Sequence, residues 1–348
     1  KFLGVSTSGA SVGSGEAVEK RDGGRRYRGL GVRKAVNIVN SKIGLHLVGK
    51  SCLNQNLIDQ LLIEIDGTVD KRLMGANTIV ASSMAVAKAG AAAKKLELFE
   101  YLNKIYSSVL GKKVKLKILK CYFNIINGRR HAANKVAFQE FMIVPLASKF
   151  SLQLQMASEI YHNLQKIIEK KFKNISVGVG DEGGFSPPIF KPEEALLLLS
   201  SAVKISGYSG RVKFAMDAAA SEFYFQKKGR SVSSGEYRAH KIFNSQNLLK
   251  YYQKLCSKYD IVSIEDPFFE NDFENFSNLT DSLKGKVQIV GDDLTVTNSE
   301  RIKAAIKQKS ANCLLLKVNQ IGTVTQALKA AALAQKAEWK KRDTHIKG

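Results

Sequence analysis

Four short apolar segments that each finish in an ionisable residue constrain the fold of this chain more than any other feature. They cover residues 212–217, 261–266, 287–293 and 313–317. Their ionisable residues, Asp217, Glu265, Asp292 and Lys317, follow one another at intervals of 48, 27 and 25 residues. An interval near 25 residues fits one buried strand followed by one helix, so the pattern predicts repeated strand-helix units and a parallel sheet.

Helical periodicity accompanies these segments. It appears over residues 55–65, 77–104, 300–307 and 323–337. At a length of 348 residues, alternating strands and helices favour a βα barrel over an open sheet. A Lys-rich stretch at 111–120 interrupts the pattern and predicts a domain junction near residue 115. We therefore expect a smaller N-terminal domain, residues 1–115, and a barrel domain, residues 116–348.

The ends of the four apolar segments predict a functional pocket. In a βα barrel, side chains at the carboxyl ends of strands converge. Asp217, Glu265 and Asp292 would repel one another there unless a divalent cation held them, and Mg²⁺ suits carboxylate ligands. Any one of these acids read alone is better explained as a helix cap or surface ion pair, but three placed alike are not.

Lys317 and two polar segments add groups that can move protons. Lys317 follows three leucines, so its amine can serve as a base, with a structural salt bridge as the alternative. Glu182 lies in the glycine-rich loop 178–187 and is read as a general acid or as a solvated loop residue. Gln139-Glu140, which follow Asn127-Gly128 and His131, form a second polar cluster.

Composition excludes several classes of protein. No apolar stretch approaches the roughly 20 residues of a membrane helix, and the start of the chain lacks a secretory signal. The four cysteines form no CxxC pair, which favours free thiols in a reducing cytosol over disulfides or zinc. The net charge of +23 comes from dispersed lysines, a pattern typical of a solvated surface rather than of a specific nucleic-acid interface.

Several motifs together resemble the enolases. The Ser8-Gly9-Ala10-Ser11, Gly180-Asp181-Glu182-Gly183-Gly184-Phe185 and Leu314-Leu315-Leu316-Lys317-Val318-Asn319-Gln320-Ile321-Gly322 segments match that family in its order. The further matching segments are 75–77, 139–142, 216–217, 221–223, 263–268 and 291–298. They extend over nearly the whole chain, and their shared order and spacing make the resemblance specific.

The resemblance implies an α+β N-terminal domain, a TIM-like barrel, two Mg²⁺ ions and a cytoplasmic homodimer. It implies the reversible dehydration of 2-phosphoglycerate to phosphoenolpyruvate, with no membrane or specific nucleic-acid partner. Lys317 would remove a proton from carbon 2, and Glu182, supported by Glu140 and Gln139, would protonate the departing hydroxyl. Asp217, Glu265 and Asp292 would hold the first metal and Ser11 the second; His131, Gln139, Glu140, Asp293 and His345 would contact substrate.

The chain also departs from the family pattern. Asn127-Gly128-Arg129-Arg130-His131 stands where enolases read Asn-Gly-Gly-Ser-His. After Ala337 the expected Ser-His-Arg-Ser strand is replaced by a charged segment that keeps only His345, and the second active-site lysine and last strand are missing. We therefore expect a chain truncated at both ends with an incomplete barrel. An alternative function is that of a catalytically impaired enolase-like protein that binds partners through its positive charge.

Overall fold

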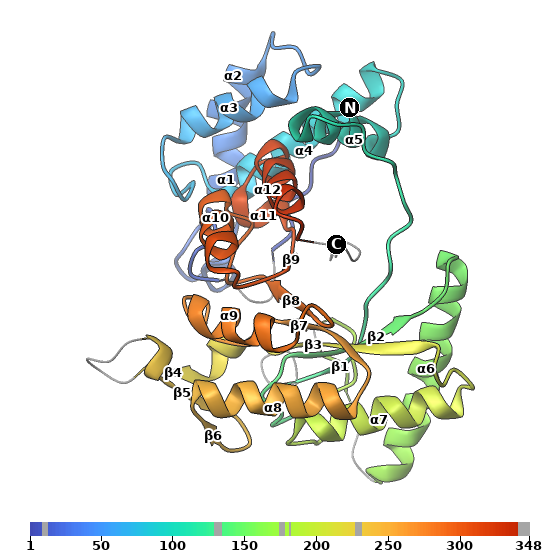
Figure 1. The fold of residues 1–348 in the computed structure, drawn as a ribbon. Coiled ribbons are helices and arrows are strands. Elements are labelled where there is room, and N and C mark those ends of the chain that lie inside the picture. The colour runs from blue at the N-terminus through green and yellow to red at the C-terminus, as the bar shows by residue number, and fades with distance from the viewer. Residues whose placement is uncertain (9–12, 129–133, 174–177, 181, 227–231, 340–348) are drawn as a thin grey trace.

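The computed structural model describes residues 1–348 except 9–12, 129–133, 174–177, 181, 227–231 and 340–348 (Figure 1). Helices make up the elements described before residue 115. They are α1 (Arg33–Ile38), a π-helical segment (Val39–Ile43), α2 (Gly44–Leu47), α3 (Gln55–Asp66), α4 (Ala76–Ala93) and α5 (Leu98–Leu110), after a 3₁₀ turn at Arg26–Gly29. None of the helices described is long and apolar enough to cross a membrane.

A six-stranded sheet organises the second half of the chain. Its spatial order is β1 (Phe123–Asn127), β2 (Glu140–Pro145), β3 (Val212–Asp217), β7 (Ile261–Glu265), β8 (Gln288–Gly291) and β9 (Cys313–Leu314). Strand β2 runs antiparallel to both of its neighbours, β1 and β3. Strands β3, β7, β8 and β9 run parallel to one another. A small antiparallel sheet contains β4 (Tyr224–Phe225), β5 (Glu236–Arg238) and β6 (Ile242–Phe243).

Among the residues that the structure describes, seven helices alternate with or follow these strands. They are α6 (Phe150–Lys171), α7 (Pro192–Ile205), α8 (Ser245–Lys258), α9 (Phe273–Ser282), α10 (Ser299–Gln308), α11 (Val318–Ile321) and α12 (Val324–Lys336). The four predicted strands are thus confirmed as β3, β7, β8 and β9, and each parallel crossover carries a helix, as a parallel sheet requires.

The predicted helix over residues 77–104 is two helices, α4 and α5. Lys95 has a positive φ of 55°, which ends the helical path after α4. The backbone N–H of Glu97 then donates to the side chain of Glu100 at 3.1 Å, half of a capping box that starts α5. The Ala-rich composition of α4 concealed this break, because propensity alone does not mark a local cap.

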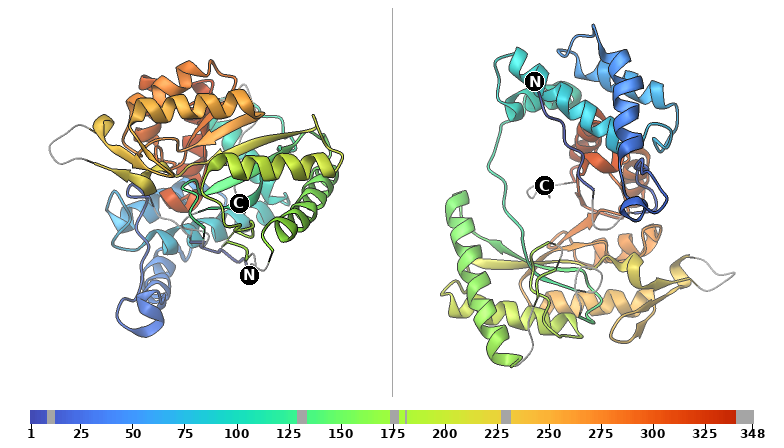
Figure 2. Two further views of the ribbon diagram at one scale, coloured as in Figure 1. Left: turned by 90° about the horizontal axis from the view of Figure 1, so that it is seen from below. Right: turned by 180° about the vertical axis from the view of Figure 1, so that it is seen from behind.

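The helices of the first half pack against the end of the second half. Residues 112–122 cross between α5 and β1 without helix or strand (Figure 1). Helix α12 nevertheless contacts α5, α3 and α4, and α11 contacts α4. Figure 2 shows α10 to α12 beside the N-terminal helices, and α7 and α8 at the opposite end of the molecule. The sequence-distant helices therefore form one layer beside the carboxyl ends of the strands.

Asp59 on α3 joins this layer to α12. It is 2% exposed and accepts hydrogen bonds from the Ser83 hydroxyl at 2.6 Å, the Gln55 amide at 2.9 Å and the backbone N–H of Thr325 at 2.8 Å. Burial raises the pKa of Asp59, and the same hydrogen bonds oppose the rise. The Ser83 hydroxyl also accepts from Val324 N–H, so two residues of the first half cap the start of α12.

Replacing Asp59 with Ala is expected to lower the free energy of unfolding by about 3 kcal/mol, because three buried donors lose their acceptor. Urea unfolding followed by circular dichroism measures this change. Glu64→Ala is the matched control, since Glu64 is an exposed acid on the same helix. Equal stability of the two variants would contradict the proposed role of Asp59.

Candidate active site

Strand register brings four buried polar residues into one row across neighbouring strands. Asn127 pairs with Glu140, Glu140 with Asp217, and Asp217 with Glu265. The four residues are between 0% and 4% exposed. Because directly paired residues point to the same face of a sheet, their side chains lie next to one another. Glu140 is the first residue of β2, whereas Asp217 is the last residue of β3. Because β2 runs antiparallel to β3, both residues lie at the same edge of the sheet.

Gln139 lies beside this row. Its side-chain amide donates to Asp217 Oδ2 at 3.3 Å, and its backbone N–H donates to the Asp217 carbonyl at 2.9 Å. The other Asp217 oxygen accepts from the Ala219 N–H at 2.9 Å. Both carboxylate oxygens are therefore held in place, which fixes the direction in which Asp217 presents its remaining lone pairs.

The glycine-rich loop closes against the first strand. The Asn127 N–H donates to the Phe185 carbonyl at 2.9 Å, the Phe185 N–H donates to the Ile125 carbonyl at 2.8 Å, and Gly183 takes a positive φ of 80°. A Cβ on Gly184 would stand 2.3 Å from Asn127 Oδ1, so only glycine fits there. Glu182 is exposed, and one of its oxygens accepts from the Asn124 amide at 2.8 Å. The loop thus lies against β1, with Glu182 hydrogen-bonded to Asn124 on that strand.

Asn127 is fully buried, and neither its amide nitrogen nor its amide oxygen has a hydrogen-bond partner among the described residues. An unpaired buried amide is costly, so native proteins usually retain one where a ligand or water completes it. Its place between Glu140 and Gly184 puts this unmet hydrogen-bonding capacity inside the candidate site.

Lys317 and Asp292 form the second half of the site. Lys317 Nζ lies 2.5 Å from Asp292 Oδ2. Gln320 donates its amide to Asp292 Oδ1 at 2.6 Å and accepts from the Thr297 hydroxyl at 3.0 Å. The same hydroxyl accepts from the Lys317 N–H at 3.0 Å. Lys317 directly precedes α11, and its ammonium contacts Asp292, which follows β8.

Gln320 also connects this pair to the N-terminal half. Its side-chain amide donates to a carboxylate oxygen of Glu16 at 3.3 Å. Its backbone carbonyl accepts from the Ala17 N–H at 2.9 Å. Gly13 packs so closely that a Cβ would lie 2.6 Å from Asp293 Oδ1. Burial, with Asp292 adding repulsion, raises the pKa of Glu16. The segment that follows Ser11 is therefore anchored directly on the site.

Asp266, Asp292 and Asp293 each offer one oxygen within 4.8 Å of the others. Burial, followed by repulsion from Asp293 and Asp292, raises the pKa of Asp266 well above its usual value. Burial, with Asp292 and Glu270, raises the pKa of Asp293 to about 7. Crowded carboxylates with raised pKa values and only hard oxygen donors fit a divalent cation.

Within this group, Asp266 binds the backbone of the other two residues. Its two oxygens accept the backbone N–H groups of Asp292 at 3.1 Å and Asp293 at 2.7 Å. Asp266 itself has a positive φ of 39°. It therefore holds the chain after β8 in the conformation that presents Asp292 and Asp293.

The structure thus gathers most of the predicted site residues at one edge of the sheet. They are Gln139, Glu140, Asp217, Glu265, Asp292, Asp293 and Lys317, with Glu182 on the adjoining loop. Ser11, His131 and His345 lie outside the described residues. Sequence reasoning missed the roles of Asn127, Asp266 and Gln320. The sequence shows Asp266 directly after Glu265. Its hydrogen bond with the Asp292 N–H depends on the position of a neighbouring strand, which the sequence pattern does not give.

Comparisons with known proteins agree with this arrangement. Residues 117–348 match the family model described as enolase, C-terminal TIM barrel domain, and residues 2–102 match enolase, N-terminal domain. The chain belongs to the enolase family. Enolases are lyases that interconvert 2-phosphoglycerate and phosphoenolpyruvate, and family membership gives this chain the phosphopyruvate hydratase activity class and the TIM-barrel fold class.

Curated enolases from distant organisms are similar over most of this chain. Enolase of Methanococcus vannielii is 46% identical over 330 residues, which are 94% of this chain and 74% of the relative. Enolase of Thermococcus gammatolerans is 47% identical, covering 95% of this chain and 74% of the relative. Enolase of Solanum lycopersicum is 45% identical, covering 98% of this chain and 78% of the relative.

Gly184→Ala tests the close packing of the glycine-rich loop. The added methyl group would collide with the Asn127 amide, so we expect a loss of about 2 kcal/mol in the free energy of unfolding. Gly178→Ala is the control, because a Cβ there meets nothing within 4 Å. A Gly184→Ala variant as stable as the Gly178→Ala variant in urea would show that the loop packs differently.

Proposed function

We propose that the strand-end pocket dehydrates 2-phosphoglycerate with Lys317 as the base and Glu182 as the acid. The observation that supports this most is the 2.5 Å contact between Lys317 and Asp292, because it joins a lysine to a carboxylate that follows the strand next to Glu265. A lysine that removes a proton has to lie beside the groups that bind the substrate, and its position after β9 meets this condition.

Glu182 has the properties expected of the acid. Its side chain is exposed, and one oxygen is oriented by Asn124, which leaves the carboxyl able to protonate a departing hydroxyl. Glu140 and Gln139 lie at the adjoining strand edge and would contact the same part of the substrate, together with Asp293. The unpartnered amide of Asn127 offers a further donor and acceptor there.

The carboxylates of Asp217, Glu265 and Asp292 would hold Mg²⁺, and Ser11 would contribute to a second ion. When bound, Mg²⁺ stabilises the negative charge that develops on the substrate carboxylate after proton removal. The family relationship supports a divalent metal, and the paired carboxylates of Asp217 and Glu265 on adjacent strands are hard oxygen donors that suit Mg²⁺. One oxygen of Asp292 lies within 4.8 Å of an oxygen of Asp266 and an oxygen of Asp293, which adds carboxylate donors at the same strand edge.

The roles of two histidines and the assembly state of the protein are proposed from the family relationship alone. His131 and His345 are proposed as substrate contacts, and a cytoplasmic homodimer is the proposed state of the protein. The domain junction near residue 115 is supported by the segment 112–122, which carries no helix or strand. The alternative, a catalytically impaired binding protein, is less well supported, because the base and the buried acids remain assembled.

Lys317→Ala is expected to reduce turnover of 2-phosphoglycerate on the order of 1,000-fold, because the reaction loses its base. The assay follows phosphoenolpyruvate formation by the purified chain with Mg²⁺. Lys303→Ala is the control, since Lys303 is an exposed lysine paired with Glu300 on α10. Folded wild-type protein without turnover would favour the binding role.

Gln320→Leu is expected to lower kcat by about 10- to 100-fold, because Asp292 and Lys317 lose the residue that orients them. Mg²⁺ affinity, measured by calorimetry, should fall in parallel, while the pH dependence of kcat should shift. Gln308→Leu, an exposed position at the end of α10, should change none of these quantities. Unchanged Mg²⁺ affinity in the Gln320 variant would show that Gln320 has only a packing role.

A further inference from the structure

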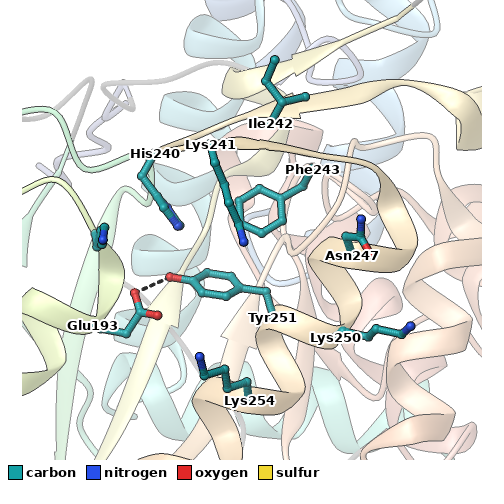
Figure 3. Close-up of a pocket in the computed structure, with 10 residues that line it drawn as sticks. Glu193, His240, Lys241, Ile242, Phe243, Asn247, Lys250, Tyr251 and Lys254 are labelled. Carbon is teal, nitrogen blue, oxygen red and sulfur yellow. Dashed lines mark hydrogen bonds between the residues drawn. The ribbon is translucent and has the colours of Figure 1, made fainter.

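A second pocket, of about 470 Å³, lies between α7, β6 and α8, away from the residues of the proposed active site. It is lined by four lysines, a histidine, four other polar or aromatic side chains and one isoleucine; these are Lys191, Glu193, His240, Lys241, Ile242, Phe243, Asn247, Lys250, Tyr251 and Lys254. Figure 3 shows His240, Lys241 and Tyr251 converging on its centre, with Lys254 on the neighbouring turn of α8. None of these residues belongs to the predicted enolase chemistry.

Positive charge dominates this pocket. The four lysines are exposed, and none has an ion-pair partner in the described part of the chain. The one carboxylate in the lining, Glu193, accepts a 2.5 Å hydrogen bond from the Tyr251 hydroxyl. Burial and Glu193 raise the pKa of Tyr251, so the hydroxyl remains a donor at neutral pH. The lining thus holds four lysines and one carboxylate, and that carboxylate already has a partner.

Three aromatic rings form one wall of the pocket, and two of them are buried. His240, Phe243 and Tyr251 form a three-ring cluster with centroids 5.1 to 5.4 Å apart. Phe243 is 2% exposed and Tyr251 is 8% exposed, so neither presents an open ring face to a ligand. Lys241 Nζ stands 4.8 Å from the Phe243 centroid, which fixes it over the ring. An occupant is therefore held by charge rather than by stacking.

His240 adds an unmet hydrogen-bonding group to the charged lining. Its Nδ1 is buried and has no partner among the described residues. Burial lowers the pKa of His240, and Lys241 and Lys191 lower it further, although Glu193 opposes them. The neutral ring with its proton on Nδ1 can donate a hydrogen bond to an anionic oxygen. A buried donor without a partner calls for an acceptor in the pocket.

We propose that this pocket binds a small polyphosphate anion, held by Lys241, Lys254 and Lys191 with a hydrogen bond from His240. Its four lysines and its volume suit a compact, multiply charged ligand, whereas an apolar ligand would cover Ile242 as the one exposed large apolar side chain of the lining. Clustered lysines bind phosphate groups as point charges, so the site selects for charge rather than for a particular organic group. A bound anion would neutralise the repulsion among the lysines of the pocket.

The test measures tripolyphosphate binding by calorimetry at 0.15 M salt without Mg²⁺, using the full chain. Wild-type protein should bind one equivalent. Lys241→Gln combined with Lys254→Gln should weaken binding about tenfold or more, since both remove an exposed charge from the pocket lining. The control combines Lys166→Gln with Lys170→Gln, two exposed lysines on α6 that remove the same charge elsewhere.

Two further measurements keep the site distinct from the proposed active site. Lys317→Ala should bind tripolyphosphate as wild type does, and the Lys241/Lys254 variant should retain wild-type turnover of 2-phosphoglycerate. The His240 ring signals in an NMR titration should move with tripolyphosphate. Equal weakening by the α6 control, loss of binding in Lys317→Ala, or unmoved His240 signals would each overturn the proposal, whether or not the chain turns over its substrate.

Discussion

The register of four adjacent strands is the constraint on which the rest of the site depends. Asn127, Glu140, Asp217 and Glu265 stand directly opposite one another, so a slip of one residue in any pair would turn a buried acid to the other face of the sheet. Hydrophobic residues fix this register, because Ile126, Phe141, Met216 and Ile264 fill the neighbouring rows and are at most 2% exposed. The packing of the core thereby decides where the carboxylates lie.

Carboxylates that lie this close repel one another, and hydrogen bonds and an ammonium group offset part of the repulsion. Asp217 and Asp266 are held by backbone N–H groups, and Asp292 is held by the Lys317 ammonium and the Gln320 amide. Residual repulsion appears in the raised pKa values of Asp266 and Asp293. A divalent cation among these oxygens would offset the remaining repulsion, so the electrostatics of the pocket and the metal dependence of the family have a common physical cause.

The N-terminal half takes part in the site through polar contacts. Glu16 and Ala17 meet Gln320, while Asp59 and Ser83 cap α12. The extended segment 112–122 alone would leave the two halves loosely joined. These buried hydrogen bonds fix the helical layer against the strand ends, and they place the segment after Ser11 beside Asp293.

The apolar segments and their terminal residues could be predicted from the sequence, because a buried strand ending in a charge is a local pattern. The general positions of Lys317, Asp292 and Asp217 followed from it. The break between α4 and α5 was missed, since the positive φ of Lys95 has no compositional signal. The hydrogen bonds of Asp266, the bridge through Gln320 and the orphaned amide of Asn127 depend on contacts between distant segments, which periodicity does not encode.

Exchange of the carbon-2 hydrogen of 2-phosphoglycerate with solvent tests the central claim most directly, because it reports proton removal alone, independently of hydroxyl departure. The folded chain with Mg²⁺ in D₂O would be followed by proton NMR. The account predicts loss of the carbon-2 signal with wild-type protein and its retention with a chain lacking the Lys317 amine. Retention of the signal with folded, Mg²⁺-bound wild-type protein would contradict the assignment of this pocket as a proton-abstracting site.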